Sequence, residues 1–380
     1  MQAVPYWRLS GFYFSYFALM GAFVPYWSLY LQSISFTAFQ IGVLTALLHV
    51  MRVFAPAVWG WLSDRTGKRL AIVQAAMAAG LLSYCGVFLD TSFGWLFVIM
   101  ALMSFFWSAS LPLMEATTLS YLRESIATYG RIRVWGSVGF ICSVAGMGYM
   151  LDTFNIESLL WALLGFNMGV VIFASQIPEA EMSGHATESL SVREIFKRPG
   201  VTAFFAACML MALAHGPYYT FYSIYLVEHG YSKSAVGWLW AIGVVSEVGV
   251  FFLMPQLMRR FRLKQLMIFS FGCAVARFLM IGWGVGSPYV VLAAQFLHAA
   301  TYGSHHATAM LLVHQFFPGR NQAKGQALYI SLTFGLGGAL GGLLSGYTWE
   351  PLGPGLTFTM SAAAVLLGLL LVEWKMRIDR

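Results

Sequence analysis

The chain has very little charge and few polar stretches from which to build a soluble surface. Only 10% of its 380 residues are Asp, Glu, Lys or Arg, against about 25% in a typical soluble domain. Hydrophobic residues make up 59% of the sequence, and the mean hydropathy is +0.71. A chain of this composition is soluble only in lipid, which excludes the soluble enzymes and soluble binding modules.

Several common chemical signatures are also missing. The sequence has no phosphate-binding loop, nucleophile elbow or metalloprotease pattern, and we predict that the protein is not an enzyme. Its histidines lack Cys or carboxylate companions at ligand spacing, so neither a metal nor a cofactor is expected. The net charge of +7 comes from basic residues that punctuate apolar runs, which argues against nucleic-acid binding. The four cysteines lie inside those runs and are interpreted as packing residues.

What the sequence does contain is a series of long apolar runs. A helix needs about 20 apolar residues to cross a bilayer, and short polar stretches divide this chain into twelve segments of that size. The predicted fold class is an all-α integral membrane protein of two pseudo-symmetric six-helix bundles, 1–176 and 200–380, joined by a central loop at 177–199. The expected spans are 8–32, 38–62, 69–89, 93–122, 130–151, 156–176, 200–227, 234–258, 264–285, 288–317, 321–347 and 355–375.

Basic residues are distributed unequally between the two ends of these spans. The even-numbered turns carry Lys and Arg from Arg65 to Lys324, whereas the odd-numbered turns carry only Lys233. By the positive-inside rule both termini and the central loop are cytoplasmic. Only Arg8 precedes the first apolar run, which lacks a small-residue cleavage site and is interpreted as an uncleaved span. We expect a multi-pass, monomeric protein of a bacterial-type inner membrane.

An internal repeat relates the two halves. The segment Ser28-Leu-Tyr-Leu31 recurs as Ser223-Ile-Tyr-Leu226, an offset of 195 positions (28 to 223). Repeated halves of this kind predict a midplane binding site and alternating access. The same offset takes Arg52 on the second span to Glu247 on the eighth. We expect these two opposite charges to meet, and Glu247 to take up a proton when they separate.

Charges at mid-membrane depth are costly and therefore mark candidate functional residues. Glu115 on the fourth span is either one member of a structural ion pair or a substrate or proton site. Arg133 on the fifth span either binds substrate or snorkels to the interface. Arg52, Glu247 and Arg277 complete the buried charges that the sequence indicates.

Histidines and tyrosines add a second group of candidates. His215 opens a stripe on the seventh span that either packs or binds ligand, comprising Tyr218, Tyr219, Tyr222 and Tyr225. On the tenth span, α-helical spacing places His298, Tyr302 and His305 on one face. His306 should point about 100° away from His305 and hydrogen-bond a neighbouring helix.

Residues 60–69 form the most informative motif, Gly-Trp-Leu-Ser-Asp-Arg-Thr-Gly-Lys-Arg. So many charges cannot lie in hydrocarbon, which predicts a tight loop at a membrane face. The motif resembles the loop between the second and third helices of the major facilitator superfamily. The resemblance implies that it gates transport, with Asp64 capping a helix N-terminus and Arg65 reaching an acid such as Glu124. The matched gating positions are Gly60, Asp64, Arg65, Gly67 and Arg69.

Within this superfamily, the N-terminal half is similar to the lactose permease family. The similarity includes Phe14-Ser-Tyr-Phe17 and the run from Met20 to Pro25. It implies that Glu115 and Arg133 hold substrate and that Phe140 replaces a stacking Trp. In the C-terminal half, Arg277 and His298 match an arginine and a histidine of the proton-coupling region of those permeases. The proton-binding carboxylate of those permeases falls at Thr301 here, so their coupling cannot be transferred residue by residue.

A closer resemblance is to the phenylpropionate permease branch. It extends over nearly the whole chain and includes the segments 129–139, 215–225, 230–240 and 243–247. It implies proton-linked uptake of an aromatic carboxylate, whose ring could stack on aromatic side chains while an arginine takes the carboxylate.

These observations predict a secondary transporter, a proton symporter of a small organic solute such as a phenylpropionate-like acid. Its partners would be that solute, protons and the lipid bilayer. The alternatives are a sugar or nucleoside symporter, and a non-transporting receptor or scaffold on the same fold. Substrate binding is assigned to Glu115, Arg133, Phe140, Arg52, His215, Tyr219 and Arg277. Proton coupling is assigned to Glu247 and His298.

Overall fold

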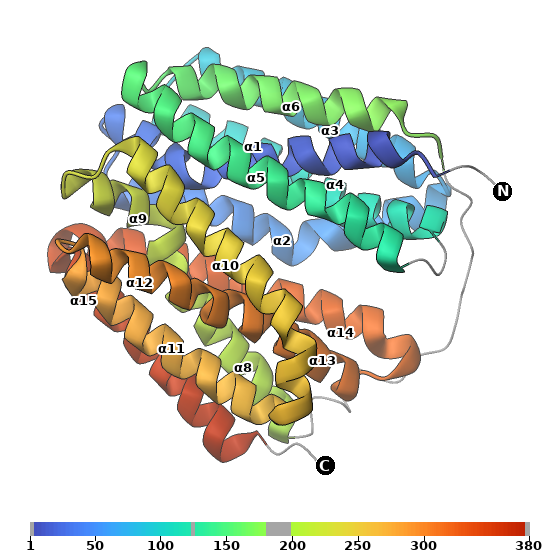
Figure 1. Cartoon of the computed structure of the whole chain (residues 1–380). Coiled ribbons are helices and arrows are strands. Elements are labelled where there is room, and N and C mark those ends of the chain that lie inside the picture. The colour runs from blue at the N-terminus through green and yellow to red at the C-terminus, as the bar shows by residue number, and fades with distance from the viewer. Residues whose placement is uncertain (1–3, 123–125, 180–198, 377–380) are drawn as a thin grey trace. The chain divides into compact units, whose positions relative to one another are not determined.

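A computed structural model describes residues 4–122, 126–179 and 199–376, most of which are helical (Figure 1). The helices of the first half are α1 Tyr6–Ser33, α2 Ala38–Thr66, α3 Arg69–Cys85, α4 Phe93–Leu122, α5 Ile126–Thr153 and α6 Ser158–Gln176. Those that follow are α8 Pro199–Ala214, α9 Gly216–Glu228, α10 Lys233–Arg260, α11 Leu263–Gly284, α12 Pro288–His298, α13 His305–Phe316, α14 Gln322–Tyr329 and α15 Gly338–Lys375. Shorter segments are the 3₁₀ turns η1 Gly86–Phe88 and η3 Gly319–Asn321, and the π-helical η2 Ala299–Ser304 and η4 Ile330–Gly337.

The helix lengths fit a membrane protein. Nine helical stretches in the described part of the chain are long and apolar enough to cross a bilayer. One of them, Lys324–Lys375, has 52 residues and is interrupted at Gly353, whose φ of 80° and ψ of 163° are not helical. This break lies between the two last expected spans. Each of the twelve expected spans coincides with helical structure.

The chain forms two compact units. Unit 1 comprises Met1–His185 with Ser232–Trp238, and unit 2 comprises Ala186–Tyr231 with Leu239–Arg380. In unit 1, α1 packs along α5 and α6, and α3 packs along α4. In unit 2, α15 packs along α8 and α11, and α11 also packs along α12 (Figure 1).

Glycine allows helices to approach closely in each unit. A Cβ atom on Gly139 of α5 would lie 2.3 Å from the carbonyl oxygen of Phe14 on α1. In unit 2, a Cβ atom on Gly341 of α15 would lie 2.3 Å from the carbonyl oxygen of Leu213 on α8. Both pairs therefore pack backbone against backbone, as small residues permit in membrane helices.

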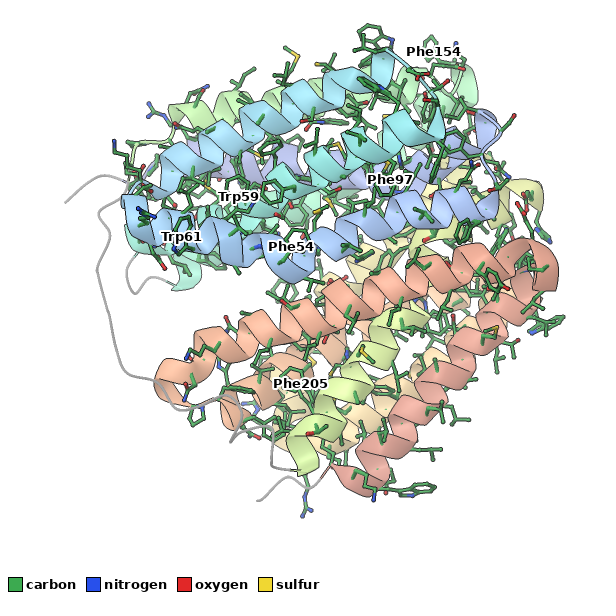
Figure 2. The ribbon with its side chains drawn as sticks, turned by 180° about the vertical axis from the view of Figure 1, so that it is seen from behind. Phe54, Trp59, Trp61, Phe97, Phe154 and Phe205 are labelled. Carbon is green, nitrogen blue, oxygen red and sulfur yellow. The ribbon has the colours of Figure 1, made fainter. Side chains whose placement is uncertain are left out.

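Large apolar side chains cover the outer surface of the helices (Figure 2). Phe54, Trp61 and Phe154 are 45%, 59% and 63% exposed, whereas Trp59 and Phe205 are buried. Exposed aromatic rings in these numbers would be a liability in water but suit contact with lipid.

The structure corrects two helix boundaries that bear on function. α2 continues to Thr66, so Gly60, Asp64 and Arg65 lie in its last turns and not in a loop. The helix stops because Gly67 adopts a left-handed conformation with φ of 65°, which glycine tolerates best. The seventh span is also not continuous. α8 ends at Ala214 and α9 starts at Gly216, where Pro217 lacks the N–H that a continuing helix needs.

Candidate functional site

In unit 1, the helices α4 and α5 bring Glu115 and Arg133 together. The Nε atom of Arg133 lies 3.8 Å from Oε1 of Glu115, and the two side chains are 31% and 37% exposed respectively. The sequence left open whether Arg133 would snorkel or pair. The structure shows the pair, with its charges partly accessible.

Aromatic rings support the arginine of this pair. The Arg133 guanidinium carbon lies 4.1 Å from the ring centre of Phe17 and 5.7 Å from that of Tyr13, both on α1. The Tyr13 hydroxyl shares a hydrogen bond of 3.1 Å with Thr118 on α4, which fixes the ring. A cation on an aromatic face beside a carboxylate offers donors, an acceptor and an apolar surface.

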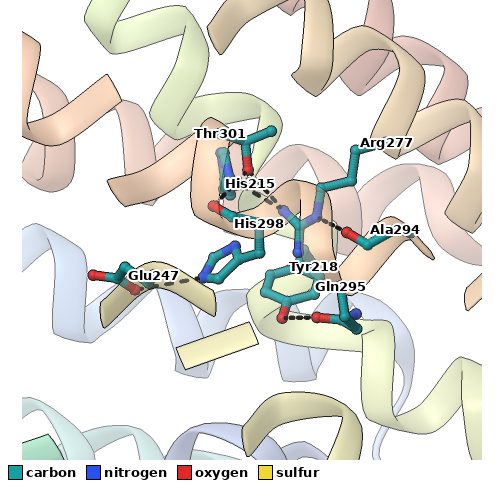
Figure 3. A network of polar contacts seen from close by, with 8 residues as sticks. All are labelled: His215, Tyr218, Glu247, Arg277, Ala294, Gln295, His298 and Thr301. Atoms are coloured by element: carbon teal, nitrogen blue, oxygen red, sulfur yellow. Dashed lines mark hydrogen bonds and ion pairs between the residues drawn. The ribbon is translucent and has the colours of Figure 1, made fainter. Parts of the chain in front are cut away.

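In unit 2, the centre of a buried polar network is Arg277 of α11 (Figure 3). The side chain is fully buried. Its Nε donates to the carbonyl of Ala294 at 3.0 Å, and its Nη1 donates to the Thr301 hydroxyl at 3.3 Å. The guanidinium carbon lies 4.2 Å from the ring centre of Tyr218. Among the described residues no carboxylate forms an ion pair with Arg277, and its Nη2 has no hydrogen-bond partner.

His215 connects this arginine to the break between α8 and α9. Its Nδ1 lies 2.8 Å from the carbonyl of Met211, and its Nε2 lies 3.4 Å from Nη1 of Arg277. Because arginine can only donate, Nε2 must be the acceptor and Nδ1 must carry the proton. His215 is therefore neutral in this arrangement.

Gln295, which was not predicted as a site residue, connects Tyr218 to Tyr222 of the predicted tyrosine stripe. The Tyr218 hydroxyl donates to Oε1 of Gln295 at 3.1 Å, and Nε2 of Gln295 donates to the hydroxyl of Tyr222. Gln295 is fully buried. An amide inside an apolar run of the tenth span is the sequence signal for this residue, and it is a weaker signal than an ionisable side chain in the same place.

A largely buried carboxylate of unit 2, that of Glu247, contacts a histidine. Oε2 of Glu247 lies 3.9 Å from Nε2 of His298, and the side chains are 17% and 6% exposed (Figure 3). Gly303 permits this position, since a Cβ atom there would lie 3.0 Å from Cγ of Glu247. The two residues assigned to proton coupling are therefore neighbours. The predicted contact of Glu247 with Arg52 would join the two units and stays a prediction.

The predicted face of the tenth span was partly wrong, because π-helical η2 interrupts it. The Tyr302 ring stacks on His298 at 5.5 Å and on His306 at 6.0 Å between ring centres. His305 instead packs edge-on against Phe271 of α11, at 5.4 Å. His306 does hydrogen-bond a neighbouring helix, as predicted, through the Tyr329 hydroxyl at 3.3 Å.

The remaining substrate candidates have less defined surroundings. Phe140 is half-buried on α5, and its backbone packs on Gly21 of α1. Arg52 is half-buried on α2, within electrostatic range of Tyr16. Tyr219 stacks on His215 with 5.9 Å between ring centres, and so extends the network of unit 2.

The predicted cap at the gating motif is replaced by another residue. The carboxylate of Glu179 accepts from the backbone N–H of Leu70, at 2.9 Å, and from that of Ala71, at 3.3 Å. The first turn of α3 is therefore capped by Glu179, which follows α6, and not by Asp64. The Arg65 guanidinium lies over the Trp61 ring at 5.3 Å. Its expected partner Glu124 lies outside the described residues.

Two further observations concern the gating motif and metals. Nη1 of Arg69 donates to the Ser120 hydroxyl at 3.3 Å, which ties the start of α3 to α4. In the part of the chain that the structure describes, no group of three or more His, Cys, Asp or Glu is placed to hold a metal ion.

Comparison with known families gives one clear match. The model of the MFS_1 like family matches residues 6–360. The chain belongs to the MFS_1-like family. Its place in the major facilitator superfamily agrees with the resemblance found at residues 60–69, and its helical membrane fold agrees with the predicted fold class.

Full-length relatives of this MFS_1-like protein are transporters. It is 28% identical over 369 residues to the "Probable 3-phenylpropionic acid transporter" of Escherichia coli (strain K12), covering 94% of this chain and 95% of that protein. It is 25% identical over 367 residues to the maltose permease of Geobacillus stearothermophilus, covering 95% and 92%. Among solved structures, the nucleoside transporter NupG (D323A mutant) superimposes with a TM-score of 0.87 at 18% identity, covering 98% of this chain and 99% of that one. The MFS_1-like chain is a multi-pass membrane transporter.

Proposed function

We propose that this transporter is a proton-coupled symporter that takes up a small organic solute, and that its preferred substrate is an aromatic carboxylate. The observation that carries the proposal is the Glu247–His298 pair, a titratable carboxylate and a titratable imidazole in the interior of unit 2. Ionisable residues inside a membrane protein are costly, and in transporters they mark ion and proton pathways.

The choice of substrate class is supported by Arg133. Its guanidinium rests on Phe17 at 4.1 Å and remains 31% exposed. A carboxylate can form a charge-assisted pair with such an arginine, while an aromatic ring packs on the neighbouring rings. The likeness to a probable 3-phenylpropionic acid transporter points to the same class.

A sugar or nucleoside is the second candidate. The observation in its favour is that Glu115 and Arg133 lie 3.8 Å apart and together offer an acceptor and donors to a polyhydroxylated ring. The likeness to a maltose permease and to a nucleoside permease supports it. Under this alternative, neutralising Glu115 would remove a direct substrate contact, whereas a carboxylate substrate would not need it.

We also infer from the repeat at an offset of 195 that 1–176 and 200–380 act as two moving halves, with 177–199 as their connection. The distribution of Lys and Arg supports cytoplasmic termini. Labelling of single cysteines placed at the two ends by a membrane-impermeant maleimide in intact cells tests this orientation. Labelling of either end from outside would contradict it.

Transport in proteoliposomes tests the substrate and the coupling together. Labelled 3-phenylpropionate, maltose and a nucleoside are offered under an inward proton gradient. We expect accumulation of the aromatic acid above the level in protein-free liposomes, which corrects for diffusion of the neutral acid, and loss of this accumulation with a protonophore. Accumulation of only the sugar or nucleoside would establish the second candidate. Accumulation that is unchanged when the protonophore is added would refute proton coupling.

Thermal unfolding of the purified protein gives an independent measure of substrate class. A ligand that binds only the folded state raises the melting temperature with its occupancy. We expect a concentration-dependent rise with aromatic acids and none with their uncharged amides, because the amide cannot pair with an arginine.

A further inference from the structure

A line of buried polar side chains runs along the contact between α11 and the tenth span. It includes Arg277 and continues beyond the network around that residue. From the tenth span it contains Thr301, Ser304, His305 and Thr308, which are 0%, 3%, 5% and 0% exposed. From α11 it contains Arg277 and Ser270, both fully buried. We call these six residues the α11 seam. They all belong to unit 2, in which α11 packs along η2 and α13.

Direct contacts connect parts of the seam. Arg277 donates to the Thr301 hydroxyl at 3.3 Å, and the Ser270 hydroxyl donates to that of Ser304 at 3.2 Å. Thr301 in turn donates to the carbonyl of His298, at 3.3 Å. The seam therefore begins beside the Glu247–His298 pair, and it continues along the tenth span toward the end of α13.

Other polar atoms of the seam are buried without a hydrogen-bond partner among the described residues. They are Nη2 of Arg277, both ring nitrogens of His305, and Oγ1 of Thr308. Nδ1 of His298, which lies at the start of the seam, is also buried without a hydrogen-bond partner among the described residues. Five such atoms in one contact between helices are unusual, because a buried polar atom without a partner costs about 1–3 kcal/mol. Protein interiors meet such a need with bound water.

His305 is the most informative of these residues. The edge contact of its ring with Phe271 needs no nitrogen, so packing alone does not account for an imidazole whose two ring nitrogens are buried without a partner among the described residues. A neutral imidazole among bound waters has a different property. It accepts a proton at one ring nitrogen and releases the other proton from the opposite nitrogen, so that a proton moves on while the ring stays neutral overall.

We propose that the α11 seam holds bound water and conducts the coupled proton between the Glu247–His298 pair and the α13 end of unit 2, with His305 as the relaying residue. This proposal rests on the proposed proton symport. Under this proposal the proton moves through unit 2, whereas the substrate binds at the partly exposed Glu115–Arg133 pair of unit 1. The charged or titratable groups around the seam include Arg277 on α11, His215 between α8 and α9, Tyr218 on α9, Glu247 on α10, Tyr329 on α14, and His298, Tyr302 and His306 on the tenth span itself.

Hydration of the seam can be tested without any transport assay. A short X-ray pulse makes hydroxyl radicals from water inside the purified protein, and these modify side chains that lie beside bound water. We expect His305 and Phe271 to be modified although both are buried. Phe204 of α8 is the matched control, because it is equally buried but packs among the aromatic rings of Phe205, Phe316 and Tyr329. Modification of Phe271 and His305 no greater than that of Phe204 would overturn the proposal.

Conduction is tested with His305→Phe. Substrate-linked proton uptake, followed with a pH dye in proteoliposomes, should fall about a hundredfold, as is typical when a positioned proton-transfer group is removed. Exchange of labelled for unlabelled substrate should remain, since the substrate pair in unit 1 is untouched. His229→Phe is the control, an imidazole at the end of α9 that lies outside the seam and hydrogen-bonds the Tyr225 carbonyl at 2.8 Å. Normal proton uptake in His305→Phe would overturn the proposal.

Failure of this proposal can be told apart from failure of the proposed function. If the wild-type protein exchanges substrate but moves no protons, proton symport itself is wrong. If the wild type moves protons and His305→Phe does so equally well, only the seam is wrong. Should His305→Phe not fold, His305→Gln, which keeps polar atoms at this position but lacks the titratable imidazole, replaces it with the same expected loss.

Discussion

At the scale of single residues, Glu115 and Arg133 allow the sharpest test of substrate binding. Each is about one third exposed, so water compensates much of a broken pair, and the loss of stability should not exceed about 1 kcal/mol. Arg133→Gln should nevertheless abolish substrate binding, because the charge that receives a carboxylate is gone. Binding is measured by ligand-dependent thermal shift, and stability by the melting temperature without ligand.

Arg131→Gln is the matched control for this variant. Arg131 lies two residues earlier on α5 with an exposed side chain, so its neutralisation removes the same charge without touching the pair. Unaltered substrate affinity in Arg133→Gln would reduce Arg133 to a structural or interfacial cation. Glu115→Gln separates the two substrate classes, since it should weaken binding of a sugar much more than binding of a carboxylate.

Glu247 allows the corresponding test of coupling. Glu247→Gln keeps the shape of the side chain but cannot take up a proton, so substrate exchange should continue while accumulation driven by a pH gradient is lost. Glu228→Gln, at the exposed end of α9, is the control. Accumulation against a gradient in Glu247→Gln would place the proton site elsewhere, with Glu115 and His298 as the next candidates.

Sequence reasoning located individual charged residues better than it located their partners. Glu115, Arg133, Glu247 and Arg277 were all identified, because a charge in an apolar run stands out. That Glu247 would lie beside His298, and that Arg277 would bond to the carbonyl of Ala294, depends on how helices pack, and one sequence does not reveal this. Gln295 was missed because an amide carries no charge.

At the scale of helices, the contact of α1 with α5 depends on the absence of a side chain at one position. Gly139→Ala would place a methyl group 2.3 Å from the carbonyl oxygen of Phe14, so the helices must move apart. We expect a loss of about 1–3 kcal/mol, the usual cost of overpacking, seen as a lower melting temperature in detergent.

Gly146→Ala on the same helix is the control for this prediction. No atom lies within 4 Å of the place that its Cβ would occupy, so it should be neutral or slightly stabilising. Equal melting temperatures for the two variants would show that α1 and α5 can move apart to accept the methyl group without a loss of stability.

The positions at which helices begin and end could be predicted from the sequence. The breaks and π-helical segments within them could be predicted only in part. The span predicted at 93–122 coincides with α4, because apolar length and polar flanks determine where a membrane helix begins and ends. The Gly216-Pro217 pair was a visible signal for the break at His215 that the sequence analysis did not use. The π-helical η2 has no comparable local signal, and it changed the neighbours of His305.

At the scale of the whole molecule, transport requires the protein to change state, whereas binding can occur in one state. A probable 3-phenylpropionic acid transporter and a maltose permease both match this chain over nearly its full length. One fold can therefore serve different substrates, and we expect a few side chains to determine which substrate binds. Residues that control the cycle should then change rates without changing affinity.

Asp64 is expected to be such a residue. It lies in the last turn of α2 with an exposed side chain, directly before the turn at Gly67 that leads into α3. It does not cap α3, because Glu179 does so, and it is remote in sequence from the Glu115–Arg133 pair. Asp64→Asn should therefore lower the transport rate severely and leave substrate affinity nearly unchanged.

Two matched variants make this prediction specific. Asp90→Asn changes another exposed aspartate, one that bonds to Ser92 in the turn before α4, and it should transport normally. Glu179→Gln weakens the cap on α3 while sparing Asp64, and so reports what the helix cap alone contributes to the transport rate. If Asp64→Asn transports at the wild-type rate at equal expression, the charged turn after α2 has no part in the cycle. If it loses affinity as well, Asp64 acts on the bound state and not on the change of state.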